Sequence, residues 1–127
     1  MYKRTLFQSF QLALVGLKHV LKTERNMKIH LAFATLAIVA SIVFKISTME
    51  FLFVIFAITI VLTAEAANTA FELLLDFIHG DKYHPDVKLL KDVAAGGVFI
   101  AALSAFAIGM LIFIPRIVPI VKKMLGL

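Results

Sequence analysis

The stretch that decides the fold is residues 51–78, which read FLFVIFAITIVLTAEAANTAFELLLDFI. Its apolar residues form a continuous run and do not alternate with polar ones, so the stretch does not resemble a strand of a membrane β-barrel. A helix needs about 20 apolar residues to cross about 30 Å of hydrocarbon, and this stretch is longer than that. We therefore predict a transmembrane helix over about residues 50–79, with polar side chains in its second half.

The composition of the whole chain also indicates a membrane protein. Of its 127 residues, 61% are hydrophobic and 17% charged, with a mean hydropathy of +0.98. Soluble domains have about 45–50% apolar and about 25% charged residues, and a chain of this size cannot bury so large an excess in one core. The absence of cysteine excludes a disulfide-stapled module and a thiolate zinc domain. With a net charge of +5, we expect anionic lipid or phosphate as the counterpart and no nucleic acid.

Two further apolar stretches are long enough to span a bilayer. Residues 29–44 read IHLAFATLAIVASIVF, and a third stretch runs from Val93 to Ile114. Pro115 follows it and is predicted to stop the helix. We predict three transmembrane helices, over about residues 26–45, 50–79 and 86–114.

The connections between these helices carry specific signals. Ser47 and Glu50 have the spacing of a capping box, which starts the second helix near residue 48. Gly80 is expected to end that helix. Pro85 suits the first turn of the third helix, which would then continue into the third span.

Residues 4–23 have a different pattern. Their apolar residues recur at helical spacing while glutamines and lysines fall elsewhere, which predicts an amphipathic helix lying in the plane of the membrane interface. A signal peptide is the alternative, but Gln11 breaks the apolar run and no small-x-small cleavage site follows. The predicted fold class is therefore an all-α membrane protein, with one interfacial helix and three spans forming a single membrane-embedded domain over residues 1–127.

The distribution of Lys and Arg predicts the orientation. Residues 1–28 hold six of them, residues 45–50 hold one and residues 79–92 hold three. By the positive-inside rule, the N-terminus and the loop near residue 80 are cytoplasmic in a multi-pass protein of the plasma (inner) membrane. The C-terminus is then outside, although its basic residues Arg116, Lys122 and Lys123 go against the rule.

Six of the eight acidic residues lie between Glu65 and Asp92. On one helix, Glu65, Asn68, Glu72 and Asp76 fall within about 80° of each other. The alternative interpretation of these four residues is a helix face exposed to solvent. This interpretation is weak because Glu65 directly follows an apolar run. An ionisable residue inside a span is costly and is by default a candidate functional residue.

Carboxylates from three helices are expected at one depth. Glu72, Glu24 and Asp92 each lie about 30 Å from the outer end of their helix. Two carboxylates at one level can hold Mg²⁺ together with substrate phosphates, and Lys91 beside Asp92 is suited to phosphate oxygens. Snorkelling lysines that contact anionic lipid are the alternative interpretation of Lys91 and of Lys88.

Three segments together resemble a known family. They are Glu24-Arg25-Asn26, Glu65-x-x-Asn68-Thr-Ala-x-Glu72-x-x-x-Asp76 and Lys91-Asp92-x-Ala-Ala-Gly-x-Val. They resemble the bacterial integral-membrane diacylglycerol kinase family over nearly the whole chain. The TERN segment, the His84-Pro85 turn and the Phe-Ile-Pro ending are more similar to its Gram-positive undecaprenol kinase branch.

The resemblance implies a homotrimer with active sites between subunits, which transfers a phosphoryl group from Mg-ATP to a lipid hydroxyl at the cytoplasmic face. It implies Glu65 as the general base, Asn68 as an orienting residue and Glu24 and Glu72 as Mg²⁺ ligands. The other candidate residues for binding the nucleotide are Asp76, Tyr83, His84, Lys91 and Asp92. The family often has an arginine near position 5, where this chain has Thr5 with Arg4 beside it.

The resulting hypothesis is an ATP-dependent lipid kinase acting on undecaprenol or, as an alternative, on diacylglycerol. A small proton-coupled transporter with Glu65 as the relay is a second class of function. A transporter, however, does not need the further acids and the Lys91-Asp92 pair at the cytoplasmic rim. A third class, a non-catalytic scaffold, leaves the polar stripe unexplained.

Overall fold

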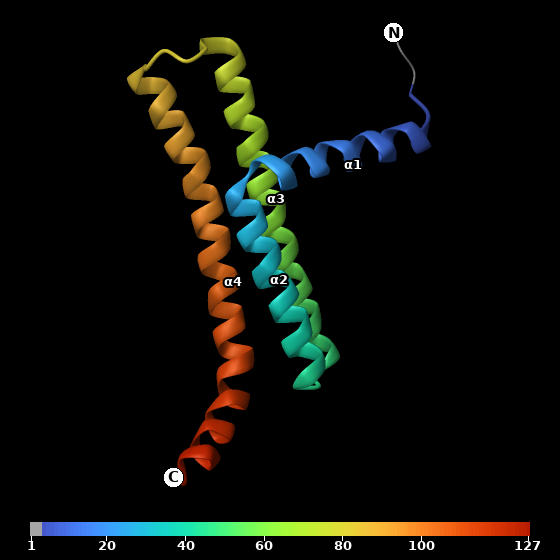
Figure 1. Cartoon of the computed structure of the whole chain (residues 1–127), viewed down its shortest axis with the longest axis vertical. Coiled ribbons are helices and arrows are strands. Elements are labelled where there is room, and N and C mark those ends of the chain that lie inside the picture. Colours follow the sequence, from blue (N-terminus) through green and yellow to red (C-terminus); the bar gives the residue numbers. More distant parts are fainter. Residues whose placement is uncertain (1–3) are drawn as a thin grey trace.

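A computed structural model describes residues 4–127, which form four α-helices with short connections. They are α1 (Leu6–Thr23), α2 (Arg25–Val43), α3 (Thr48–His79) and α4 (Pro85–Leu125). Helices α2, α3 and α4 run lengthwise, whereas α1 projects from their side (Figure 1). Three of the described helices, α2, α3 and α4, are long and apolar enough to cross a membrane. The predicted all-α class and the three helices capable of spanning a membrane are thereby confirmed.

Helix α3 is the central element, because it packs against both α2 and α4. Its buried residues recur every three or four positions from Val54 to Thr69, with Leu75 further along the same face, as expected for a helix that packs on one stripe. They are Val54, Ala57, Val61, Glu65, Thr69 and Leu75. The stripe is apolar in its first half and turns polar at Glu65, so the candidate functional residue lies on the packing face.

The predicted start and end of α3 and the predicted start of α4 are confirmed in detail. The Ser47 hydroxyl accepts from the Glu50 amide at 3.2 Å, and the Glu50 carboxylate accepts from the Ser47 amide at 2.8 Å. Gly80 ends α3 with a φ of 72°, a conformation that suits a residue without Cβ. Pro85 is in the first turn of α4.

The N-terminal boundaries add a local detail. Thr5 caps α1 by a capping box with Gln8, so it has a structural role at the start of this helix. The chain then leaves α1 at Glu24 in an extended conformation and enters α2 directly. The side chain of Glu24 makes no capping hydrogen bond.

The predicted helix stop at Pro115 is wrong, since α4 continues through Pro115 and Pro119 to Leu125. A proline removes one backbone donor and usually kinks a helix, and the last part of α4 bends away in Figure 1. Pro115 has no N–H to donate to the carbonyl of Leu111, four residues earlier, and the neighbouring Arg116 guanidinium donates to the Ile112 carbonyl at 2.6 Å. In an apolar environment, ending the helix would leave more backbone groups without partners than the kink does.

Candidate active site between α2, α3 and α4

The site is centred on Glu65, which is 1% exposed. Its Oε2 atom accepts no hydrogen bond. The His30 Nε2 atom of α2 is 3.8 Å away, which is beyond hydrogen-bond distance. A buried carboxylate oxygen without a partner destabilises the fold, so its presence here requires a functional explanation.

Asn68 lies one turn further along the same face. Its Nδ2 donates to Glu72 Oε1 at 3.0 Å, and this bond fixes the orientation of the amide. The Oδ1 atom is therefore left as a buried acceptor without a partner. Glu65 and Asn68 thus present two unsatisfied acceptor oxygens from one helix face.

Both residues line a cavity of about 300 Å³, which is at the lower end of the size range of small-molecule sites. Helix α2 contributes Asn26, Ile29 and His30 to its wall. Helix α4 contributes only apolar residues, which are Ala95, Val98, Phe99 and Ala102. The cavity therefore has polar groups on α2 and α3 and an apolar wall on α4.

Two further carboxylates, those of Glu24 and Glu72, are close enough to act electrostatically on Glu65. They come from the α1–α2 junction and from α3. Within residues 4–127, no three His, Asp or Glu side chains form a complete metal-binding cluster. Apart from His30 Nε2, the donor atoms near Glu65 are oxygens, including the unpartnered Asn68 Oδ1. This set fits Mg²⁺, which takes few protein ligands and completes its shell with water and phosphate oxygens.

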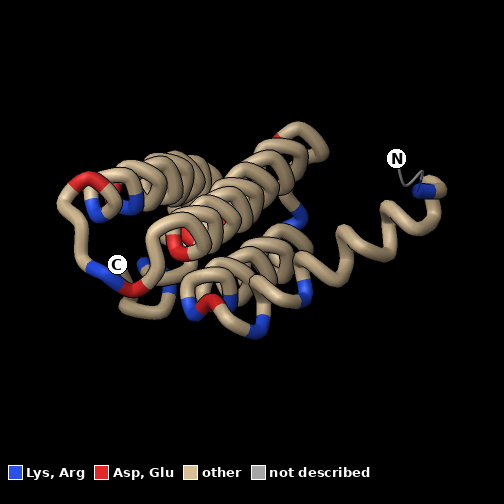
Figure 2. The backbone as a smooth tube through the Cα atoms, turned by 90° about the horizontal axis from the view of Figure 1, so that it is seen from above, with Lys and Arg blue, Asp and Glu red and all other residues tan. Residues whose placement is uncertain are grey.

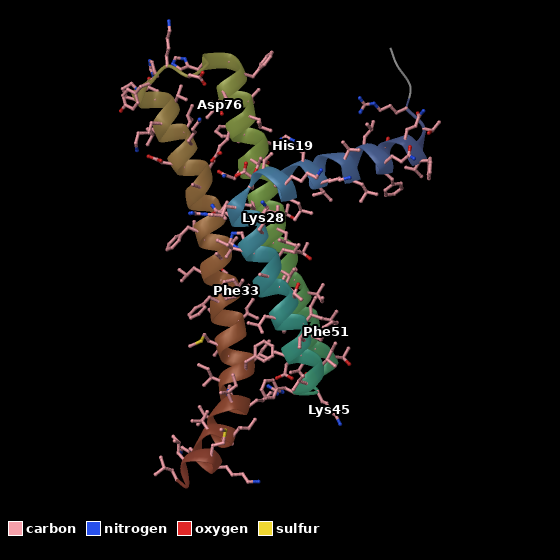
Figure 3. All side chains as sticks on the ribbon, in the orientation of Figure 1. His19, Lys28, Phe33, Lys45, Phe51 and Asp76 are labelled. Atoms are coloured by element: carbon pink, nitrogen blue, oxygen red, sulfur yellow. The ribbon has the colours of Figure 1, made fainter. Side chains whose placement is uncertain are left out.

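A second polar group lies nearer the loop that joins α3 and α4. The Lys91 ammonium contacts Asp76 Oδ1 at 2.5 Å and so links α4 to α3. Lys88 contacts Asp92 Oδ2 at 2.5 Å along α4. Acidic and basic positions lie together around this end of the helices (Figure 2). Asp76 lies toward this end of the molecule and Lys45 toward the opposite end (Figure 3).

The structure separates the predicted site residues into these two groups. Glu65 and Asn68 line the cavity, with Glu72 bonded to Asn68, while Asp76, Lys91 and Asp92 lie outside it. The loop residues do not line the cavity either. Tyr83 is 77% exposed, and the His84 Nδ1 atom caps α4 by accepting from the Asp86 amide at 3.2 Å.

Sequence reasoning missed His30. It lines the cavity and faces Glu65, whereas Lys88 and Lys91, the basic residues that the sequence singled out, make their ion pairs outside the cavity. The available signal was a single histidine near the start of the apolar run 29–44. Its distance along the chain from Glu65 gave no reason to connect the two.

Comparison with known proteins agrees with this arrangement. A family model described as prokaryotic diacylglycerol kinase matches residues 11–113, which include every residue that lines the cavity. The chain belongs to the prokaryotic diacylglycerol kinase family. The predicted resemblance is therefore confirmed, and the chain is a member of a family of lipid kinases, which are phosphotransferases with an alcohol acceptor.

Two relatives within the prokaryotic diacylglycerol kinase family show how far the similarity extends. The chain is 36% identical to the undecaprenol kinase of Bacillus subtilis (strain 168) over 111 residues, which are 87% of this chain and 89% of that protein. It is 31% identical to the diacylglycerol kinase of Synechocystis sp. (strain ATCC 27184 / PCC 6803 / Kazusa) over 110 residues, which are 87% of this chain and 63% of that protein.

Proposed function

We propose that this protein transfers the γ-phosphate of Mg-ATP to the hydroxyl of a membrane lipid at the cytoplasmic interface of the plasma membrane. The observation that carries the proposal is the buried Glu65 side chain, which lines a cavity with an apolar wall and whose Oε2 has no hydrogen-bond partner. Membership of a lipid kinase family supports this reaction over a proton-coupled transporter.

In the proposed reaction, the lipid hydroxyl oxygen attacks the γ-phosphorus of ATP. A new P–O bond forms to the lipid, the bond between the γ-phosphorus and the leaving ADP oxygen breaks, and the hydroxyl proton passes to Glu65 Oε2. A general base of this kind contributes about 10²–10⁴-fold to a rate. Asn68 is held by Glu72 and directs its Oδ1 toward the reacting groups.

Phosphoryl transfer depends mainly on positioning and on neutralising charge. We assign Glu24 and Glu72 as the residues that hold Mg²⁺, which supplies that neutralisation when bound. The remaining nucleotide contacts are assigned to Asp76, Tyr83, His84, Lys91 and Asp92. Lys91 is suited to this because it forms an ion pair at the surface, so a phosphate oxygen can compete with Asp76 for the ammonium.

We favour undecaprenol over diacylglycerol as the acceptor. The relative named undecaprenol kinase is the more similar of the two and matches along 89% of its own length, against 63% for the diacylglycerol kinase. The TERN segment and the His84-Pro85 turn support the same choice.

The membrane arrangement is also part of the proposal. Helix α1 projects across the direction of α2, α3 and α4 (Figure 1), as a helix lying in the interface plane would. The Lys and Arg distribution supports a cytoplasmic N-terminus and a cytoplasmic α3–α4 loop. Large apolar side chains are exposed on every helix of the single chain, including Phe10, Phe33, Phe56 and Phe106, and lipid together with two further subunits of a homotrimer would cover them.

The test is a phosphorylation assay in detergent, with purified protein, labelled ATP, Mg²⁺ and either undecaprenol or diacylglycerol. We expect each lipid to be labelled when it is supplied alone, and undecaprenol to be labelled faster than diacylglycerol. Chelation of Mg²⁺ should abolish the labelling of both. Failure to label either lipid would overturn the proposal, as would an activity that needs a proton gradient and consumes no ATP. Faster labelling of diacylglycerol would overturn the choice of acceptor alone.

A further inference from the structure

His30 lines the same cavity as Glu65 and has no role in the reaction proposed above. Its side chain is 19% exposed, and it lines the cavity from α2 while Glu65 lines it from α3. Within residues 4–127, His30 is the one basic side chain in ion-pair distance of Glu65. The other charged groups that act on Glu65 are the carboxylates of Glu24 and Glu72.

The distance between the two side chains is informative. His30 Nε2 and Glu65 Oε2 are 3.8 Å apart, which is too far for a direct hydrogen bond. One oxygen atom can hydrogen-bond to both atoms across this separation, at about 2.8–3.0 Å from each, once a small side-chain movement opens the closely covered Oε2 toward the cavity. Because Glu65 Oε2 has no other partner, the gap is suited to a group that donates to the carboxylate and accepts from the imidazole.

An alcohol has this combination of properties, since a hydroxyl has one donor and two acceptor lone pairs. We propose that His30 Nε2–H donates to the oxygen of the acceptor hydroxyl while the hydroxyl proton points at Glu65 Oε2. The second lone pair then remains for the attack on the γ-phosphorus. His30 thus fixes the rotation of the hydroxyl, which Glu65 alone does not do.

This inference rests on the proposed function and adds a binding contact for the acceptor. The contact requires a hydrogen on Nε2, which both the neutral Nε2–H tautomer and the imidazolium provide. Asn26 and Asn68, the other polar residues of the cavity, are neutral amides. The role is therefore one of hydrogen-bond donation, and an uncharged donor at the same place should replace it.

The experiment compares substitutions that keep or remove this donor. His30→Gln keeps an N–H at comparable reach. His30→Leu removes the donor, and His30→Asn keeps an amide that is too short to reach. For Leu and Asn we expect kcat to fall about tenfold or more and KM for the lipid to rise, because one hydrogen bond in the transition state is lost. His30→Gln should remain within a few-fold of the wild type.

The nucleotide side provides the second readout. KM for ATP and the affinity for a non-hydrolysable ATP analogue with Mg²⁺ should be unchanged in all three variants. His19→Gln and His19→Leu are the matched controls, because His19 is exposed on α1, and neither should change any of these constants.

The outcomes separate the inference from the function on which it rests. An active wild type with equally active Leu and Asn variants would overturn the role of His30 alone. Equal losses in the Gln, Asn and Leu variants, with KM for ATP and for lipid raised together, would show a structural role and would also overturn it. A wild type that labels neither lipid would overturn the proposed function and the inference together.

Discussion

Glu50 and Glu65 are both acidic residues of α3, and their surroundings are opposite. The Glu50 carboxylate accepts from the Ser47 amide and from the Arg116 guanidinium, each at 2.8 Å. The Glu65 carboxylate is more deeply buried and its Oε2 accepts nothing. In a membrane protein, a polar group kept for structure is expected to have partners, because leaving it without them is costly. The comparison therefore indicates that Glu50 stabilises the fold, and it supports the proposal that Glu65 serves the reaction.

The partners of Glu50 extend the structural explanation. Arg116 joins the start of α3 to α4 and also donates to the Ile112 carbonyl, three residues before Pro115. The same guanidinium therefore contacts a capping residue of α3 and a backbone carbonyl of α4. Around Glu65, in contrast, the structure provides a cavity.

The largest effect is expected for Glu65→Gln. The amide keeps the shape of the side chain but cannot accept a proton from the lipid hydroxyl, so turnover should fall by about 100-fold or more. The phosphorylation assay measures this, with size-exclusion chromatography as the check on folding and assembly. Turnover near that of the wild type would contradict the assignment of Glu65 as the base.

The next largest effect is expected for the proposed Mg²⁺ ligands. Glu24→Ala and Glu72→Ala should each raise the Mg²⁺ concentration at half-maximal activity by about tenfold or more, because a small number of protein oxygens hold the ion. Titration of activity with Mg²⁺ at saturating ATP measures this. If only one of the two substitutions has the effect, the idea of a shared metal site is wrong.

A smaller effect on activity is expected for Lys91→Gln. The ion pair with Asp76 is at the surface and contributes little to stability, so the protein should fold normally. Loss of the ammonium should raise KM for ATP several-fold with little change in KM for the lipid. An unchanged KM for ATP would favour the alternative that Lys91 contacts anionic lipid.

The smallest effect on activity is expected for Arg116→Gln. This change removes the link to Glu50 and the side-chain donor at Ile112, and it leaves the cavity untouched. Turnover per folded protein should equal that of the wild type, while the midpoint of thermal unfolding should fall by a few degrees. A large loss of turnover in the folded protein would mean that the two regions are coupled.

Much of the fold was predictable from local sequence signals. The capping box at Ser47, the stop at Gly80 and the start at Pro85 involve residues that are close in sequence, and all three are confirmed. The stop at Pro115 was wrong because a proline removes one backbone hydrogen bond without necessarily ending a helix in apolar surroundings, and the contact of Arg116 with Glu50 on another helix is not visible in the local sequence.

The site was predictable in part for the same reason. Glu65, Asn68 and Glu72 share one helix, so their spacing revealed the polar face. His30 comes from another helix, and only the packing of α2 against α3 shows that it faces Glu65. The pairing of Lys91 with Asp76 likewise depends on the packing of α4 against α3.

The most direct test of the contrast between the two acids is the thermal unfolding of Glu65→Gln and Glu50→Gln, measured side by side with the wild type in the same detergent. If Glu65 is kept for the reaction, neutralising it removes a buried carboxylate without a partner, and the variant should unfold at the same temperature as the wild type or higher. Glu50→Gln should unfold at a lower temperature, because its ion pair with Arg116 is lost. A Glu65→Gln protein that loses as much thermal stability as Glu50→Gln would contradict the account.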